Sequence, residues 1–101
     1  MTTVVTNFQL HALYLYMSKK EKLKKRFLTK PRDFTFDELT SLLIALGYKI
    51  SNKGKTSGSR VSFVHSITGH IIALHKPHPA NTLKVYQVNE ILDELDKQQL
   101  L

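Results

Sequence analysis

Histidines are the side chains in this sequence whose ordinary pKa lies close enough to neutral pH to transfer protons there. His65, His70, His75 and His78 follow one another in the second half of the chain. An imidazole exchanges its proton near neutral pH, so each of them can serve as an acid or a base there. His75 and His78 precede a predicted helix, whose first backbone N–H groups attract an anion. We therefore expect His75 or His78 to act on an anionic group, the alternative being two polar side chains beside a turn.

Spacing disfavours two other kinds of site. His75 and His78 are three residues apart, but no carboxylate or thiol stands near them to complete a metal site. Without cysteine the chain has neither a disulfide framework nor a thiolate zinc site. Gly54-Lys55-Thr56 matches the end of a phosphate-binding loop, but the glycine that such a loop needs five residues earlier is Lys49 here. We expect no metal and no small-molecule cofactor.

The chain is short and strongly basic. Its 101 residues fit one small domain, and 15 Lys+Arg against 8 Asp+Glu give a formal net charge of +7. Such a charge favours an anionic partner, above all nucleic acid, with a merely soluble basic surface as the alternative. The apolar stretch from Phe8 to Met17 is too short to cross a bilayer, and positive charge follows it, unlike an export signal. We expect a cytoplasmic protein without a membrane partner.

The first third of the chain, residues 1–33, predicts a basic and poorly ordered tail. Residues 1–16 show neither helical periodicity nor turn chemistry, and Met17-Ser18 would be a natural start, so they are interpreted as non-native upstream sequence or as an interaction tail. The run from Lys19 to Lys30 is typical of a solvated tail, which can also bind phosphates without folding. We therefore expect residues before about Lys30 to be dispensable for the fold.

The elements that would position the histidines lie in residues 34–98. Thr35 and Glu38 form a capping box, and Phe34 with Leu39 a hydrophobic staple, which predict a helix over Phe36 to Leu46 before Gly47. Strands are predicted over residues 48–51, 60–65 and 70–75, with a basic loop at 52–58 and a hairpin turn at 66–69. A second amphipathic helix is predicted from Lys84 to Gln98, with a solvated acidic face. The sequence therefore predicts an α+β fold of order α-β-β-β-α, whose three-stranded antiparallel sheet carries both helices on one face.

The order of these features resembles the HicA toxins of HicAB toxin–antitoxin modules. The resemblance covers Leu39 to Leu95 and rests on Leu46-Gly47-Tyr48, on Gly58-Ser59 at the second strand, and on His78-Pro79 before Leu83-Lys84 and a helix with Ile91-Leu92. It implies a fold like a double-stranded RNA-binding domain, ribosome-independent cleavage of mRNA, and inhibition by a HicB-type antitoxin.

One position departs from that family. Its Gly-Ser is typically followed by a histidine assigned to catalysis, whereas Arg60 follows Gly58-Ser59 here. Arginine stays protonated and cannot accept a proton from a ribose hydroxyl, although it can bind a phosphate. The chain is thus either a toxin that cleaves mRNA with His75, His78 and Arg60, a non-catalytic RNA-binding module of the same fold, or a basic protein that only assembles with a protein partner. The residues expected to contact RNA are Lys49, Lys53, Lys55, Ser59 and Arg60.

Hairpin register makes the prediction for Arg60 and His75 specific. If His65 faces His70 across the turn, then Arg60 stands opposite His75, and the two side chains share a face. The alternate residues of both strands are more apolar and should face the helices, which leaves Arg60 and His75 on the open face. An arginine so close disfavours protonation of the imidazole, so His75 could act as a base while Arg60 holds the phosphate. The alternative is an incidental cross-strand pair. His65 and His70 are expected to be structural or partly exposed.

Overall fold

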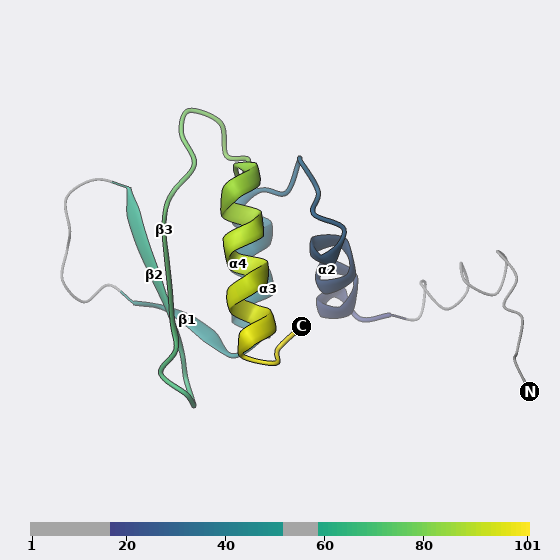
Figure 1. The fold of residues 1–101 in the computed structure, drawn as a ribbon, viewed down its shortest axis with the longest axis vertical. Coiled ribbons are helices and arrows are strands. Elements are labelled where there is room, and N and C mark those ends of the chain that lie inside the picture. Colours follow the sequence, from purple (N-terminus) through teal and green to yellow (C-terminus); the bar gives the residue numbers. More distant parts are fainter. Residues whose placement is uncertain (1–16, 52–58) are drawn as a thin grey trace, which may run out of the picture.

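Three helices and one sheet make up the described part of the chain. The computed structural model describes residues 17–51 and 59–101. Its elements are α2 (Lys19–Leu28), α3 (Phe36–Ala45), β1 (Tyr48–Ser51), β2 (Arg60–His65), β3 (Ile71–His75) and α4 (Val85–Lys97). Helices α3 and α4 lie against one face of the sheet, and α2 packs on their far side (Figure 1). From α3 onward, the predicted α-β-β-β-α order and its α+β fold are confirmed.

The sheet is antiparallel, with the strand order β1-β2-β3. Its register pairs Arg60 with His75 and Phe63 with Ile72, as the hairpin argument predicts. Because side chains alternate along a strand, Phe63 and Ile72 point toward the helices, where both are buried. Arg60 and His75 lie on the opposite face and are exposed. The sheet therefore has one covered face and one open face.

The capping box fixes where α3 begins. The backbone N–H of Glu38 donates to the Thr35 hydroxyl at 3.1 Å, and the Glu38 carboxylate accepts from the Thr35 backbone N–H at 3.1 Å. Beyond the last turn of the helix, Gly47 has a φ of 102°, a conformation that glycine adopts without strain. The helix thus ends where β1 must begin.

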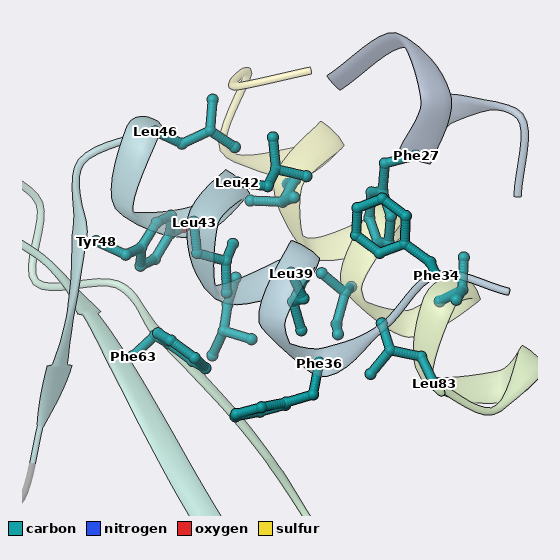
Figure 2. Packing of buried hydrophobic residues seen from close by; sticks show 14 residues of the cluster. Phe27, Phe34, Phe36, Leu39, Leu42, Leu43, Leu46, Tyr48, Phe63 and Leu83 are labelled. Carbon is teal, nitrogen blue, oxygen red and sulfur yellow. The ribbon is translucent and has the colours of Figure 1, made fainter. Parts of the chain in front are cut away.

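The core lies between the sheet and the helices. Leucines of α3, Leu39, Leu42 and Leu43, are fully buried there, and Figure 2 shows them between Phe63 of the sheet and the other helices. Helix α4 contributes the buried apolar residues Val88, Ile91 and Leu95 to the core.

Among the described helices, none has both the length and the apolarity that a bilayer-spanning segment requires.

Helix α2 corrects the prediction of a poorly ordered tail up to residue 33. Ser18 caps the helix, because its hydroxyl accepts from the Glu21 backbone N–H at 3.2 Å. Phe27 is fully buried, with its ring centroid 4.8 Å from that of Phe34 (Figure 2). The basic run therefore folds, because one apolar side chain per turn is enough to pack it on α3 and α4. The prediction for residues 1–16 lies outside the described residues.

Arg26 joins α2 to the start of α3. Its guanidinium donates to Glu38 at 2.7 Å and to Asp33 at 2.9 Å, and it lies 5.0 Å from the centre of the Phe34 ring. A planar guanidinium can satisfy two carboxylates and an aromatic face together. This cation of the basic run is thus committed to the fold.

Candidate nucleic-acid interface

The open face of the sheet gathers two of the predicted RNA-contacting residues and one of the predicted catalytic histidines. Lys49, Arg60 and His75 are all exposed on it. Small or apolar side chains separate them, and in the described part of the strands no carboxylate lies on this face. Its residues are Lys49, Ser51, Arg60, Ser62, Val64, Ile71, Ala73 and His75.

Arg60 and His75 face each other at the end of the hairpin farthest from its turn. The backbone bonds from His65 N–H to His70 O (2.9 Å) and from Lys76 N–H to Ser59 O (2.8 Å) mark hydrogen-bonded pairs on either side of them. By alternation Arg60 and His75 form a non-hydrogen-bonded pair, whose Cα atoms lie about 4.5 Å apart and whose side chains are close neighbours. A permanent cation thus stands beside an imidazole on an accessible surface.

A buried glutamine holds the end of β3 in place. The Gln87 amide nitrogen donates to the His75 carbonyl oxygen at 2.9 Å, and its amide oxygen accepts from the Lys84 backbone N–H at 3.0 Å. One side chain therefore links the first turn of α4 to the strand that carries the histidine. Gln87 positions His75 through its backbone and leaves the imidazole free to point away from the helix.

His78 belongs to a neighbouring hollow of about 300 Å³ at the same end of the sheet. The Lys76 ammonium in this hollow lies 5.4 Å from the centre of the Phe36 ring, a cation–π contact that turns it toward the covered face. The hollow is lined by Ser59, Lys76, Pro77, His78, Pro79 and Asn81. The first turn of α4, expected to supply anion-binding N–H groups beside His78, is not part of this lining. The structure thus divides the predicted site between the open face, with Arg60 and His75, and the hollow, with Ser59 and His78.

The segment around His78 is anchored to the start of α3. Phe36 N–H donates to the Asn81 carbonyl at 2.8 Å, and Leu83 N–H donates to the Phe34 carbonyl at 2.9 Å. The Asn81 amide also donates to Asp37 at 3.2 Å. The connection between β3 and α4 is therefore held at several points.

His65 has a structural role, as predicted. Its Nε2 lies 3.0 Å from the Leu46 carbonyl oxygen, and its Nδ1 accepts from the Ile67 N–H at 3.2 Å. A Cβ on Gly47 would come within 2.7 Å of the same ring. The imidazole thus fills the space that a glycine leaves at the end of α3.

His70 is the centre of a hydrogen-bonded chain of three side chains. The Tyr48 hydroxyl lies 2.8 Å from His70 Nδ1, and His70 Nε2 lies 2.8 Å from the Glu94 carboxylate. Burial, and then the negative charge of Glu94, raise the pKa of the Tyr48 phenol. These contacts join β1, the hairpin and α4 on the covered side of the sheet. His70 is therefore structural, and Glu94 is engaged rather than simply solvated on an acidic helix face.

Several functional contacts have little signal in the sequence. Gln87 occupies the third position of α4, where glutamine completes a capping box, but Lys84 lacks the hydroxyl that makes this motif recognisable. The contact of Glu94 with His70 depends on how α4 packs on the sheet, and the contact of Lys76 with Phe36 depends on how α3 packs on it. The predicted RNA contacts at Lys53 and Lys55 lie outside the described residues. Within residues 17–51 and 59–101, no group of three His, Asp or Glu side chains could hold a metal ion.

Comparison with known proteins identifies the family. The family model described as the HicA toxin of bacterial toxin–antitoxin systems matches residues 36–96, more than half of the chain. Searches of curated proteins and of solved structures gave no significant match. The match begins at the first residue of α3 and ends within α4, so α2 precedes it. It includes the sheet with its open face, the hairpin and the hollow, and the chain belongs to the HicA toxin family of bacterial toxin–antitoxin systems.

Proposed function

We propose that this HicA-family chain binds mRNA through the open face of its sheet. The observation that carries the proposal is the separation of charge between two surfaces. Lys49 and Arg60 are exposed on a sheet face without described carboxylates, whereas Glu90, Asp93 and Glu94 lie along α4. Phosphate groups contribute most of the affinity of sequence-independent nucleic-acid binding, and they favour the first surface.

Arg60 is the residue best placed to hold a phosphate. Its guanidinium presents several N–H donors in a plane that matches two phosphate oxygens. Lys49 contributes a second cation on the outer strand β1, and Ser51 and Ser62 lie between them with hydroxyl groups. RNA laid across β1 and β2 would meet these groups in succession. The resemblance of the chain to mRNA-cleaving toxins supports RNA as the nucleic acid.

Cleavage of the bound RNA is a second proposal, which the pairing of Arg60 with His75 favours. Metal-independent cleavage transfers a proton from the 2′-hydroxyl to a base and another to the leaving 5′-oxygen, while negative charge builds on the phosphate. His75 would accept the first proton, and Arg60 would stabilise the charge. The 2′-oxygen then attacks the phosphorus as the bond to the 5′-oxygen breaks, which leaves a 2′,3′-cyclic phosphate and a 5′-hydroxyl whose proton comes from solvent water. Without this step, the chain is an RNA-binding module of the same fold.

A gel experiment on the purified protein separates these readings. A labelled single-stranded RNA is incubated with the protein in EDTA, and one half of each sample is run on a native gel and the other on a denaturing gel. A salt-dependent shift with shortened RNA supports binding and cleavage. A shift with intact RNA supports the binding module. If the protein neither shifts nor cleaves the RNA at low salt, the proposed function is contradicted.

The partner follows from the same family. Membership implies a cognate antitoxin, and we propose that it is a HicB-type protein that acts with this chain in the cytoplasm. Co-expression with the protein encoded by the neighbouring gene tests this proposal. Recovery of a stable complex that no longer shifts RNA is expected, and a partner that leaves RNA binding unchanged would contradict it.

A further inference from the structure

A groove separates the outer edge of β3 from α4. Its volume is about 440 Å³, and it is lined by residues 71–75 of the strand and by Tyr86, Gln87, Glu90, Ile91, Asp93 and Glu94 of the helix. Because the strand order is β1-β2-β3, β3 has a strand neighbour on one side only. Its other side faces this groove, which runs along the edge of the sheet and is bordered by the open-face residues Ile71, Ala73 and His75.

The backbone of this edge has unused pairing capacity. The bonds from His65 N–H to His70 O and from Lys76 N–H to Ser59 O fix which residues of β3 pair with β2. Alternation then turns the N–H and C=O groups of Ile71 and Ala73 away from β2 and toward the groove. In the described residues these groups make no hydrogen bond to a side chain or to loop backbone. Two residues after Ala73, the carbonyl of His75 also points outward, and it accepts a hydrogen bond from the Gln87 amide.

The side chains around the groove combine apolar surface with negative charge. Ile71 is 59% exposed and Tyr86 is 54% exposed, although both are large apolar or aromatic residues. Carboxylates of α4 form the other wall, at Glu90, Asp93 and Glu94. Asp93 pairs with Lys97 on the helix surface and Glu94 with His70, while Glu90 has no ion pair among the described residues. The chain has a formal net charge of +7, so this negatively charged wall has the opposite sign to the molecule as a whole.

We propose that this edge binds a short extended segment of a partner protein, which adds a fourth strand to the sheet and carries lysine or arginine at alternate positions. Its backbone would pair with Ile71 and Ala73, and Gln87 would end the pairing at His75. Every second side chain would point toward α4. There a long cationic side chain can lay its apolar stem along Tyr86 and place its charge beside Glu90. RNA is disfavoured here because the carboxylates repel phosphate. The groove shares Ile71, Ala73 and His75 with the open face, but it does not include the proposed phosphate contacts Lys49 and Arg60.

A designed peptide provides the probe. The capped heptapeptide Thr-Lys-Val-Lys-Val-Lys-Thr is titrated into the full chain labelled with ¹⁵N, and amide shifts and hydrogen exchange are followed by NMR. We expect saturable shifts and slower exchange at the amides of Ile71 and Ala73. A peptide with glutamate in place of each lysine, and one with proline in place of each valine, should not bind. Equal binding of the glutamate peptide, shifts confined to β1 and β2, or no binding of the lysine peptide would overturn the proposal.

Three variants make the test specific. Ala73→Pro removes an N–H that points into the groove and leaves the pairing with β2 intact, so binding should weaken about tenfold in a protein that still folds. Glu90→Gln with Asp93→Asn should weaken binding and reduce its salt dependence. Asp96→Asn removes a carboxylate of α4 that lines a different hollow, so the affinity for the lysine peptide should stay at the wild-type value. Circular dichroism checks the fold of Ala73→Pro, and if that variant does not fold, the double variant decides alone. Wild-type affinity of the double variant would contradict the proposal.

Discussion

Single side chains determine which chemistry the open face can perform. The resemblance to HicA toxins implies a histidine at the position of Arg60, and an arginine cannot act as a base in its place. The antiparallel register, however, puts His75 directly across from it. In the proposed cleavage, β2 would supply the arginine that holds the phosphate, and β3 would supply the histidine that takes the proton. We therefore propose His75 as the catalytic base, and His78, the other predicted candidate, lines the adjoining hollow.

The first prediction compares these two histidines. If the chain cleaves RNA, His75→Ala should lower the cleavage rate by about 10²- to 10⁴-fold, the usual contribution of an acid–base group. RNA affinity should change little, because Arg60 and Lys49 remain. His78→Ala is the matched control and should cleave at the wild-type rate. Single-turnover cleavage measured for both variants in EDTA provides the comparison. Undiminished cleavage by His75→Ala would remove the proposed base.

A second prediction concerns Tyr48, whose phenol has a raised pKa because it is buried and faces Glu94. The folded state therefore holds the phenol proton more tightly than the unfolded state does. Below the ordinary pKa of 10.0 this preference stabilises the native state, and the stabilisation is lost as the pH rises through the higher, folded-state pKa. Tyr48→Phe has no such proton to lose.

At neutral pH, Tyr48→Phe should lower the free energy of unfolding by about 1 kcal/mol, because the hydrogen bond to His70 is lost. Above the ordinary pKa of tyrosine, the difference in the free energy of unfolding between Tyr48→Phe and wild type should shrink. Urea unfolding of both proteins from neutral to alkaline pH measures it, and the exposed Tyr86→Phe serves as the control. A difference that stays constant or grows at alkaline pH would contradict the argument.

At the scale of elements, α2 is the helix that precedes the residues matched by the family model. It packs on α3 and α4, and its Phe27 is fully buried. Ser18 and Glu21 have the spacing of a capping box, and Leu23 and Phe27 are four residues apart on one face. These signals are present in the sequence, but the lysines around them are typical of a solvated tail and favour that interpretation. A helix needs only a narrow apolar stripe when its neighbours supply the rest of the core.

The third prediction tests whether α2 belongs to the cooperative fold. Phe27→Ala should lower the free energy of unfolding by about 3–5 kcal/mol, the usual result of emptying a buried aromatic site. The neighbouring Leu28→Ala removes a side chain that is 51% exposed, and it should have little effect. Thermal unfolding is the measurement, since about 1 kcal/mol shifts the Tm of a domain of this size by about 4–8 °C. Equal Tm values for the two variants would show that α2 adds nothing to the core.

The other elements were predictable because local signals define them. A capping box and a staple mark the start of α3, and alternation of apolar residues marks the strands. The short turn after His65 fixes the hairpin register, and the register then pairs Arg60 with His75. This part of the candidate site could be derived from the sequence, because only neighbouring strands are involved.

Contacts between distant elements could not be derived in the same way. The chain from Tyr48 through His70 to Glu94 joins residues more than twenty positions apart, and it depends on the distance at which α4 lies from the sheet. Gln87 reaches the His75 carbonyl for the same reason. Periodicity shows which face of a helix is apolar, but it does not show which polar residue at its margin meets a particular backbone group.

At the scale of the whole molecule, the layers separate the charges. The open face of the sheet carries Lys49 and Arg60, whereas the carboxylates Glu90, Asp93 and Glu94 lie on α4, across the groove from the β3 edge. Helix α2 lies on the far side of α3 and α4 from the sheet, so α3 and α4 separate it from the open face (Figure 1). Its first two residues, Lys19 and Lys20, are exposed lysines. Positive charge on both sides would raise the rate of encounter with the proposed RNA ligand, whereas contact with the phosphates should occur on the sheet.

The position of these lysines provides a matched test of RNA binding at the open face. Two double variants each remove two exposed positive charges. Lys49→Gln with Arg60→Gln acts on the sheet, and Lys19→Gln with Lys20→Gln acts on α2. Because both variants have the same net charge, a general loss of electrostatic attraction affects them equally. Any difference between them therefore reports where the phosphates are bound.

The decisive measurement is the affinity for a single-stranded RNA as a function of salt concentration, obtained by fluorescence anisotropy for wild type and both double variants. Each phosphate contact contributes about 0.7 to the slope of log affinity against log salt for single strands. The sheet variant should therefore lose about 1.4 of the slope and bind weakly, while the α2 variant keeps the wild-type slope. Equal slopes for the two variants, or a larger loss in the α2 variant, would contradict binding on the open face.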